Sequence, residues 1–181
     1  DVLRLCHAVP SAALHNNGWL SGGIAVALTI LFALAYFHYN DKKRVEMVVT
    51  TKKNMKKDVK LVFVSDLHLG YHNTRADLHR WLTLLKAEHP DAILIGGDLI
   101  DGSYRPVAQE HMAEEFRSLD IPAIACLGNH DYYTGLNADL QFCRDAGIMV
   151  LRDKTVNINE IGNITVIGRD DRTNRQRKSL S

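Results

Sequence analysis

The sequence predicts an α/β domain with a mainly parallel sheet, preceded by one transmembrane helix. Three observations support this fold class: short apolar runs alternate with amphipathic stretches, glycine or polar residues close each run, and one uncharged stretch near the N-terminus is much longer than the rest. Strands that alternate with helices imply right-handed crossovers between parallel strands. The chain has 181 residues, enough for one domain and a short appendage.

The long uncharged stretch is Trp19–Phe37. A helix rises ~1.5 Å per residue, so a helix of this length roughly matches a ~30 Å hydrocarbon core. Aromatic residues that favour the headgroup region lie at its two ends: Trp19, Tyr36 and Tyr39. A buried core helix rarely runs so long without a charge, and a signal peptide is usually shorter. We therefore predict a transmembrane helix over 18–39, after an N-terminal segment at 1–17.

Basic residues cluster directly after this helix: Lys42, Lys43, Arg44, Lys52, Lys53, Lys56, Lys57 and Lys60. By the positive-inside rule, such a cluster places the C-terminal side of the helix in the cytoplasm. It would also be attracted to anionic lipid headgroups, and a solvated linker without lipid contact is the alternative. We predict membrane localisation, a domain on the cytoplasmic face, and a basic juxtamembrane linker with a first strand at 40–58.

The rest of the chain, 59–181, alternates strands and helices. Apolar runs bounded by turn residues predict strands at 45–50, 60–65, 92–96, 121–127, 148–151, 155–159 and 163–168. A first helix over 74–89 has apolar residues at helical spacing, with Asn73 or Thr74 as its cap. A second helix over 105–119 has a proline in its first turn, and a third over 135–147 ends in a glycine, a natural left-handed stop.

Polar motifs follow three of the predicted strands: "SDLH" at 65–68, "GGDLID" at 96–101 and "GNHD" at 128–131. In α/β sheets, ligands bind outside the carboxyl ends of the strands. If the strands are neighbours, these side chains converge: Asp66, His68, Asp98, Asn129 and His130. Two carboxylates and an imidazole pressed together favour a cation between them. Mixed nitrogen and oxygen ligands suit manganese, iron or zinc.

Each motif alone is weak, because every one of them also occurs in ordinary turns. Their joint occurrence is more specific, since each follows a strand and the intervals are similar. Asp98 lies 32 residues after Asp66, and Asn129 lies 31 residues after Asp98. The set as a whole therefore indicates a divalent metal site.

The three motifs resemble those of the calcineurin-like metallophosphoesterases, whose signature is D-x-H, G-D-x-x-D and G-N-H-[DE]. In this sequence they stand as "DLH" 66–68, "GDLID" 97–101 and "GNHD" 128–131, and the likeness covers about 59–170. The membrane anchor resembles the membrane-attached bacterial branch of that family. The resemblance implies a metallophosphoesterase-type α/β sandwich.

The resemblance also implies a role for each site residue. Two divalent metal ions would be held by four residues: Asp66 and His68 on the first, Asp98 between both, and Asn129 on the second. His130 would act as proton donor or charge stabiliser at the leaving group, with Asp131 orienting it. Asp101 would lie outside the ligand set. The implied reaction is attack of a metal-activated water on a phosphomonoester or phosphodiester.

This chain departs from the family pattern after His130, because no histidine follows it. The family completes its site with further histidines, two of them in a G-H-x-H motif. Four other histidines lie on predicted helices or their edges, where a solvated or packing role is expected: His72, His79, His89 and His111. We therefore expect the chain to be the N-terminal half of the fold, and expect the 181-residue chain alone to be inactive.

Composition excludes some classes of function. A net charge of +1 argues against a nucleic-acid binder, and three cysteines without metal-type spacing indicate neither a disulfide framework nor a zinc knuckle. The anchor favours a phospholipid-like substrate by location alone. Two alternatives stay open, both without catalysis: a membrane-tethered binding protein of the same fold, and a scaffold that contacts lipid.

Overall fold

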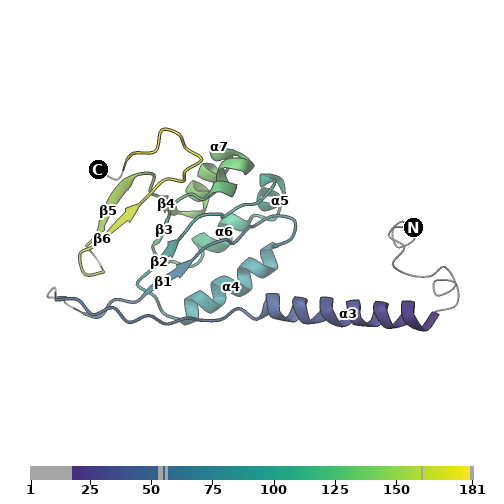
Figure 1. Cartoon of the computed structure of the whole chain (residues 1–181). Coiled ribbons are helices and arrows are strands. Elements are labelled where there is room, and N and C mark those ends of the chain that lie inside the picture. The colour runs from purple at the N-terminus through teal and green to yellow at the C-terminus, as the bar shows by residue number, and fades with distance from the viewer. Residues whose placement is uncertain (1–17, 53–54, 56, 160, 180–181) are drawn as a thin grey trace. The chain divides into compact units, whose positions relative to one another are not determined.

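The computed structural model describes residues 18–52, 55, 57–159 and 161–179, and the chain divides after Lys52 into two units (Figure 1). The predicted N-terminal segment, 1–17, lies outside the described residues. So do Lys53 and Lys56 of the basic cluster.

The described part of the N-terminal unit, 18–52, contains the helix α3, Gly18–Asn40, of 23 residues. Its side chains are exposed, and by length and composition it could cross a membrane. Residues 41–50, all within the described part of the chain, form neither helix nor strand, so the predicted strand at 45–50 is not found. Its apolar side chains are exposed, Val45 and Val48 among them. A strand needs a neighbour for its backbone hydrogen bonds, and no described strand pairs with this segment.

The C-terminal unit is built on a four-stranded sheet of β1 (Leu61–Val64), β2 (Ala92–Ile95), β3 (Ala123–Ala125) and β4 (Ile148–Val150). The strand order is β1-β2-β3-β4, and every pairing is parallel. In β2 the side chains on both faces are buried, as expected for a strand inside a parallel sheet. β1 forms one edge, with Leu61 and Phe63 exposed.

Four helices pack on one face of this sheet: α4 (Arg75–Ala87), α5 (Tyr104–Gln109), α6 (Met112–Arg117) and α7 (Asn129–Ala146). Thr74 is the N-cap of α4, one of the two expected. The helix predicted over 105–119 is split into α5 and α6 at His111, whose φ of 54° lies in the left-handed region. The helix predicted over 135–147 begins earlier, at Asn129, and bends at Gly135.

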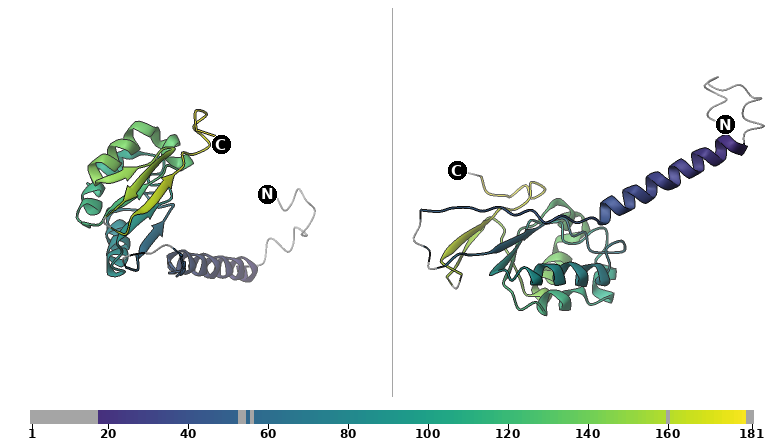
Figure 2. Two further views of the ribbon diagram at one scale, coloured as in Figure 1. Left: turned by 90° about the vertical axis from the view of Figure 1, so that its left-hand side faces the viewer. Right: turned by 90° about the horizontal axis from the view of Figure 1, so that it is seen from below.

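A two-stranded antiparallel sheet covers part of the other face. It consists of β5 (Lys154–Ile158) and β6 (Ile164–Gly168). A second apolar cluster lies between the two sheets and includes Ile124, Leu151 and Ile158. Figure 2 shows the β5–β6 pair on the side of the parallel sheet opposite the helices. The predicted α/β class and parallel sheet are thus confirmed.

Candidate metal centre

The loops that leave β1 and β2 run side by side beyond the strand ends. The Asp66 N–H donates to the Gly97 carbonyl oxygen at 3.1 Å, and the His68 N–H donates to the Asp98 carbonyl oxygen at 3.0 Å. Leu69 repeats the pattern with Leu99 at 2.8 Å. These hydrogen bonds hold the "DLH" motif directly beside "GDLID".

Three residues of these loops have left-handed backbone conformations. The φ angles are 59° at Asp66, 44° at His68 and 55° at Asp98. Such angles are uncommon for residues with a side chain and cost on the order of 1 kcal/mol each. The hydrogen bonds between the loops maintain them. With this backbone conformation, the Asp66, His68 and Asp98 side chains come together and do not alternate between two faces as they would in a strand.

The "GNHD" motif packs against the loop after β2 through a close contact between Gly97 and Gly128. A side chain at Gly97, whose φ is 102°, would collide with the backbone nitrogen of Gly128. A side chain at Gly128 would collide with the Asp98 carboxylate. Because neither residue carries a Cβ, α7 can begin against the β2 loop. The His130 N–H then donates to Asp98 Oδ1 at 2.9 Å.

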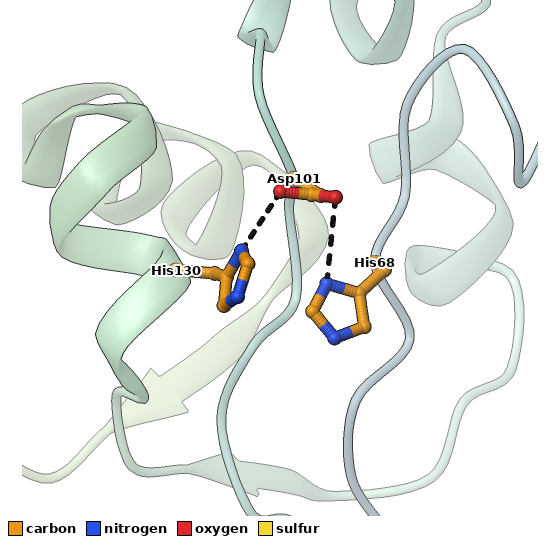
Figure 3. A group of neighbouring side chains, drawn as sticks. All are labelled: His68, Asp101 and His130. Atoms are coloured by element: carbon orange, nitrogen blue, oxygen red, sulfur yellow. Dashed lines mark hydrogen bonds and ion pairs between the residues drawn. The ribbon is translucent and has the colours of Figure 1, made fainter. Parts of the chain in front are cut away.

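The side chains form two overlapping groups whose ligand atoms lie within 4.8 Å of one another. One group is Asp66, His68 and Asp98; the other is His68, Asp101 and His130. Figure 3 shows Asp101 between the two imidazoles. Its Oδ1 lies 2.8 Å from His130 Nδ1, and its Oδ2 lies 3.8 Å from His68 Nδ1. The two rings are perpendicular, with centroids 4.7 Å apart.

Comparison with known proteins agrees with this geometry. The sequence model of the calcineurin-like phosphoesterase family matches residues 59–174. The chain belongs to this family. The match spans the parallel sheet, the three motifs and the β5–β6 pair.

Curated relatives of this phosphoesterase family carry similar names. An uncharacterized metallophosphoesterase of Aquifex aeolicus (strain VF5) is 33% identical over 138 residues, 75% of this chain and 50% of the relative. A transmembrane protein with metallophosphoesterase domain of Danio rerio is 35% identical over 79 residues, 42% of this chain and 17% of the relative.

A third relative has a named substrate. The UDP-2,3-diacylglucosamine pyrophosphatase LpxG of Chlamydia trachomatis is 31% identical over 84 residues, 45% of this chain and 25% of the relative. Across these relatives, the chain spans half of the relative's length or less.

The hydrogen bond between Asp101 and His130 shifts the pKa of both side chains. It lowers the pKa of Asp101, and the same contact raises the pKa of His130. Each partner favours the charged form of the other. The sequence motif predicts this orienting contact from Asp131, whereas in the structure Asp101 makes it.

Asp131 contacts backbone instead of His130. Its fully buried carboxylate accepts hydrogen bonds from four N–H groups: Gly128 at 2.8 Å, Asp98 at 2.9 Å, Leu99 at 2.8 Å and Ile100 at 3.4 Å. Burial raises the pKa of Asp131, and these donors oppose that shift. The reason for the different contact is its place on α7. It is the third residue after the N-cap Gly128, from which a carboxylate folds back onto the cap.

The donor set fits a divalent cation. Nδ1 of His68 is buried, makes no hydrogen bond among the described residues and lies 3.8 Å from Asp101 Oδ2, so Nε2 is the nitrogen that faces Asp66. The Asp66 carboxylate is 63% exposed and lies 3.8 Å from His68 Nε2. Two ligand atoms that each stand ~2.0–2.2 Å from one ion can be separated by this distance. Asn129, the first residue of α7, is half-buried and directly precedes His130, whose N–H donates to Asp98 Oδ1.

Four further histidines of the C-terminal unit lie outside this site. Nδ1 of His79 lies 2.8 Å from Glu115, and Nδ1 of His111 lies 3.6 Å from Glu114, both glutamates being on α6. His72 and His89 are exposed. Among the described residues, the imidazoles at the candidate metal site are therefore those of His68 and His130.

Proposed function

We propose that this chain supplies the metal-binding half of a metal-dependent phosphoester hydrolase. The observation that carries the proposal is the grouping of Asp66, His68 and Asp98 within 4.8 Å of one another, in a member of the calcineurin-like phosphoesterase family. Asp66 and His68 would hold one ion, Asn129 would bind a second, and Asp98 would be a ligand of both. Manganese, iron and zinc accept such mixed ligands.

When bound, the ions lower the pKa of coordinated water and neutralise the charge that grows on phosphate. The protein's own groups supply the rest. His130 carries a proton more readily than an ordinary histidine because Asp101 accepts its hydrogen bond. It therefore donates to the leaving oxygen. Asp131 holds the backbone of the two loops that present Asp98 and Asn129.

For the substrate, we propose a phosphomonoester or phosphodiester attached to a lipid-like group. Two observations support this class. The α3 helix could cross a membrane by length and composition, and the relative LpxG is named for cleavage of UDP-2,3-diacylglucosamine. The basic residues after α3 favour a domain on the cytoplasmic face.

Substitution of the shared carboxylate tests the function. Asp98→Asn should lower hydrolysis of bis(p-nitrophenyl) phosphate and p-nitrophenyl phosphate, with manganese added, by about a hundredfold or more. Asp91→Asn is the matched control, because Asp91 precedes β2 as Asp98 follows it and pairs with Lys57 on the surface. Both the 181-residue chain and the complete gene product should be assayed. Equal rates and metal contents for the two variants would refute the assignment.

The same assay separates the hydrolase from a binding protein without catalysis. If the complete gene product binds manganese through Asp66 and Asp98 but turns over neither substrate, the binding-protein alternative replaces the enzyme. If Asp66→Asn and Asp98→Asn leave metal binding unchanged, the metal centre itself is wrong.

Orientation is tested with a cysteine in the linker. Lys52→Cys should react with a membrane-impermeant maleimide only after the cells are permeabilised, and the chain without this substitution gives the background. Reaction in intact cells would place the linker outside the cytoplasm.

A further inference from the structure

Asp170 is a buried charge outside the metal centre, two residues after β6. It is 3% exposed, and its carboxylate accepts four hydrogen bonds. Oδ1 accepts from the Tyr132 hydroxyl at 2.6 Å and the Asp171 N–H at 2.9 Å. Oδ2 accepts from Arg152 Nε at 3.0 Å and Asn174 Nδ2 at 2.9 Å. Every lone pair that a carboxylate uses readily is thus occupied.

Tyr132, Arg152 and Asp170 form a closed ring of hydrogen bonds. The second guanidinium nitrogen of Arg152, Nη2, donates to the Tyr132 hydroxyl at 3.1 Å, so tyrosine, arginine and aspartate each contact the other two. Burial raises the pKa of Asp170, but the donors outweigh it and the pKa is lowered. The carboxylate therefore stays ionised opposite Arg152. A closed, charge-assisted set of this kind has one geometry, which makes it a rigid joint.

The joint connects segments that are far apart in sequence. Arg152 follows β4 at the carboxyl edge of the parallel sheet, and Asp170 follows β6 of the second sheet. Tyr132 lies in the first turn of α7, three residues after Asn129 and two after His130. Residues three apart on a helix are neighbours on its surface, so a constraint on Tyr132 acts on Asn129.

This turn of α7 is consequently held from two sides. Asp131 ties it to the loop after β2 through the N–H groups of Asp98 and Leu99. Tyr132 ties it to the segment after β6. With either attachment released, the helix start could rotate about the other.

We infer that Asp170 is a positioning residue for the metal centre: through the Tyr132 hydroxyl it fixes the turn that presents Asn129 and His130 against Asp98. The inference rests on the proposed function for the roles of Asn129 and His130. It extends the site to the segment after β6, which the metal motifs do not include.

Amide hydrogen exchange in the metal-free protein tests the positioning without any turnover. The reporter is the His130 N–H, whose acceptor is Asp98 Oδ1. Asp170→Asn and Tyr132→Phe should each speed its exchange about tenfold or more. The Leu78 N–H, which donates to the Thr74 carbonyl oxygen at the start of α4, should keep its wild-type rate. Asp171→Asn, a neighbouring carboxylate that accepts from the Thr173 N–H, is the matched control and should change neither.

Two results would overturn the inference. One is a wild-type exchange rate at His130 in both test variants. The other is equal acceleration at His130 and Leu78, which would mean a purely structural role. Tyr132→Phe removes a single hydroxyl, so it decides the question if Asp170→Asn does not fold.

The assay for hydrolysis reads the consequence separately. In the complete gene product with manganese, Asp170→Asn and Tyr132→Phe should lower kcat about tenfold or more with little change in KM, while Asp171→Asn keeps the wild-type rate. Failure of the wild-type protein to hydrolyse phosphoesters would refute the proposed function, and the exchange rates would still decide the positioning role. Wild-type kcat in both test variants would overturn the inference.

Discussion

The two halves of α7, on either side of Gly135, each bury an aspartate with no exposed surface. In the first half, Asp131 accepts hydrogen bonds from four backbone N–H groups. In the second half, neither oxygen of Asp139 has a hydrogen-bond partner among the described residues. The same side chain, equally buried on one helix, is satisfied in one place and unsatisfied in the other.

The difference shows in what opposes the effect of burial on the pKa of each residue. Burial raises the pKa of Asp139 to about 8, and repulsion from Asp131 adds to the shift. Burial also raises the pKa of Asp131, but its four donors stabilise the ionised form and oppose the shift. The first half of α7 therefore uses a carboxylate to position the metal loops. The second half carries an acid that is mostly protonated at neutral pH and lowers stability.

The largest effect is expected from Asp131→Ala. It leaves four N–H groups near the metal centre without their acceptor, and hydrogen bonds to charged groups are worth ~1.5–3 kcal/mol each. We expect the free energy of unfolding to fall by about 3 kcal/mol or more, measured by urea denaturation. Manganese binding should weaken as well, because the loops with Asp98 and Gly128 lose their tie. A cost no larger than that of Asp139→Ala would contradict the comparison.

Asp139→Ala should have the opposite sign. It removes a buried carboxyl group that has no hydrogen-bond partner within the described ranges, and the small cavity left behind costs less than the polar burial. Alanine also has the higher helix propensity. We expect the free energy of unfolding at pH 7 to rise by about 2 kcal/mol in urea denaturation. A loss of stability would show that Asp139 has a partner that offsets its burial.

The sequence predicts the elements of this fold better than their ends. Apolar runs bounded by turn residues identify every strand of both sheets, because burial in a sheet is a local pattern. The same pattern at 45–50 fails, since pairing depends on a neighbour that the pattern does not contain. The single helix predicted over 105–119 breaks at His111, where a non-glycine residue adopts a left-handed conformation that propensities do not indicate.

For the candidate site, the strand-end rule brings the three motifs together from sequence alone. Which carboxylate contacts His130 depends on backbone turns at Asp66 and Asp98, and these follow from the hydrogen bonds between loops. The role of Asp131 could have been read from its third position after a glycine cap. Asp170 carried no such signal, because its partners are distant in sequence.

The raised pKa of Asp139 makes the stability of the protein depend on pH. Asp139 has a pKa of about 8 in the folded protein, against an ordinary value of 3.8. Between these values the folded state keeps a proton that the unfolded state has released. Stability therefore falls as pH rises through this window, by at most ~1.4 kcal/mol per unit, and levels off above it.

Two neighbouring groups, Cys143 and Tyr104, do not titrate in the same range. Burial raises the pKa of Cys143 to about 12 and also raises the pKa of Tyr104, so both stay neutral across the window. The measurement is urea denaturation at several pH values between 5 and 9, for the wild type and Asp139→Ala. The slope attributed to Asp139 should be missing from the variant. Parallel curves for the two proteins would assign the slope to other groups.

The smallest effect is expected at Gly135, where α7 bends between its two halves. Gly135 has a φ of 122° and a ψ of 102°, a conformation that residues with a Cβ rarely adopt. Its surroundings are open, because a Cβ there would meet no atom within 4 Å. Gly135→Ala therefore changes the backbone preference alone. If the bend keeps its angle, the alanine backbone at this position is strained. If the helix straightens there, the strain disappears.

Gly147→Ala at the end of α7 is the matched control, because Gly147 also has open surroundings but a φ of 72°, which alanine can adopt at a cost of about 1 kcal/mol. We expect Gly135→Ala to lower the free energy of unfolding by about 1 kcal/mol more than Gly147→Ala does. Equal costs would mean that the bend relaxes, and that the two aspartates lie on one continuous helix in the variant. The contrast between Asp131 and Asp139 would then come from what each half of α7 packs against, since no fixed bend would separate the two residues.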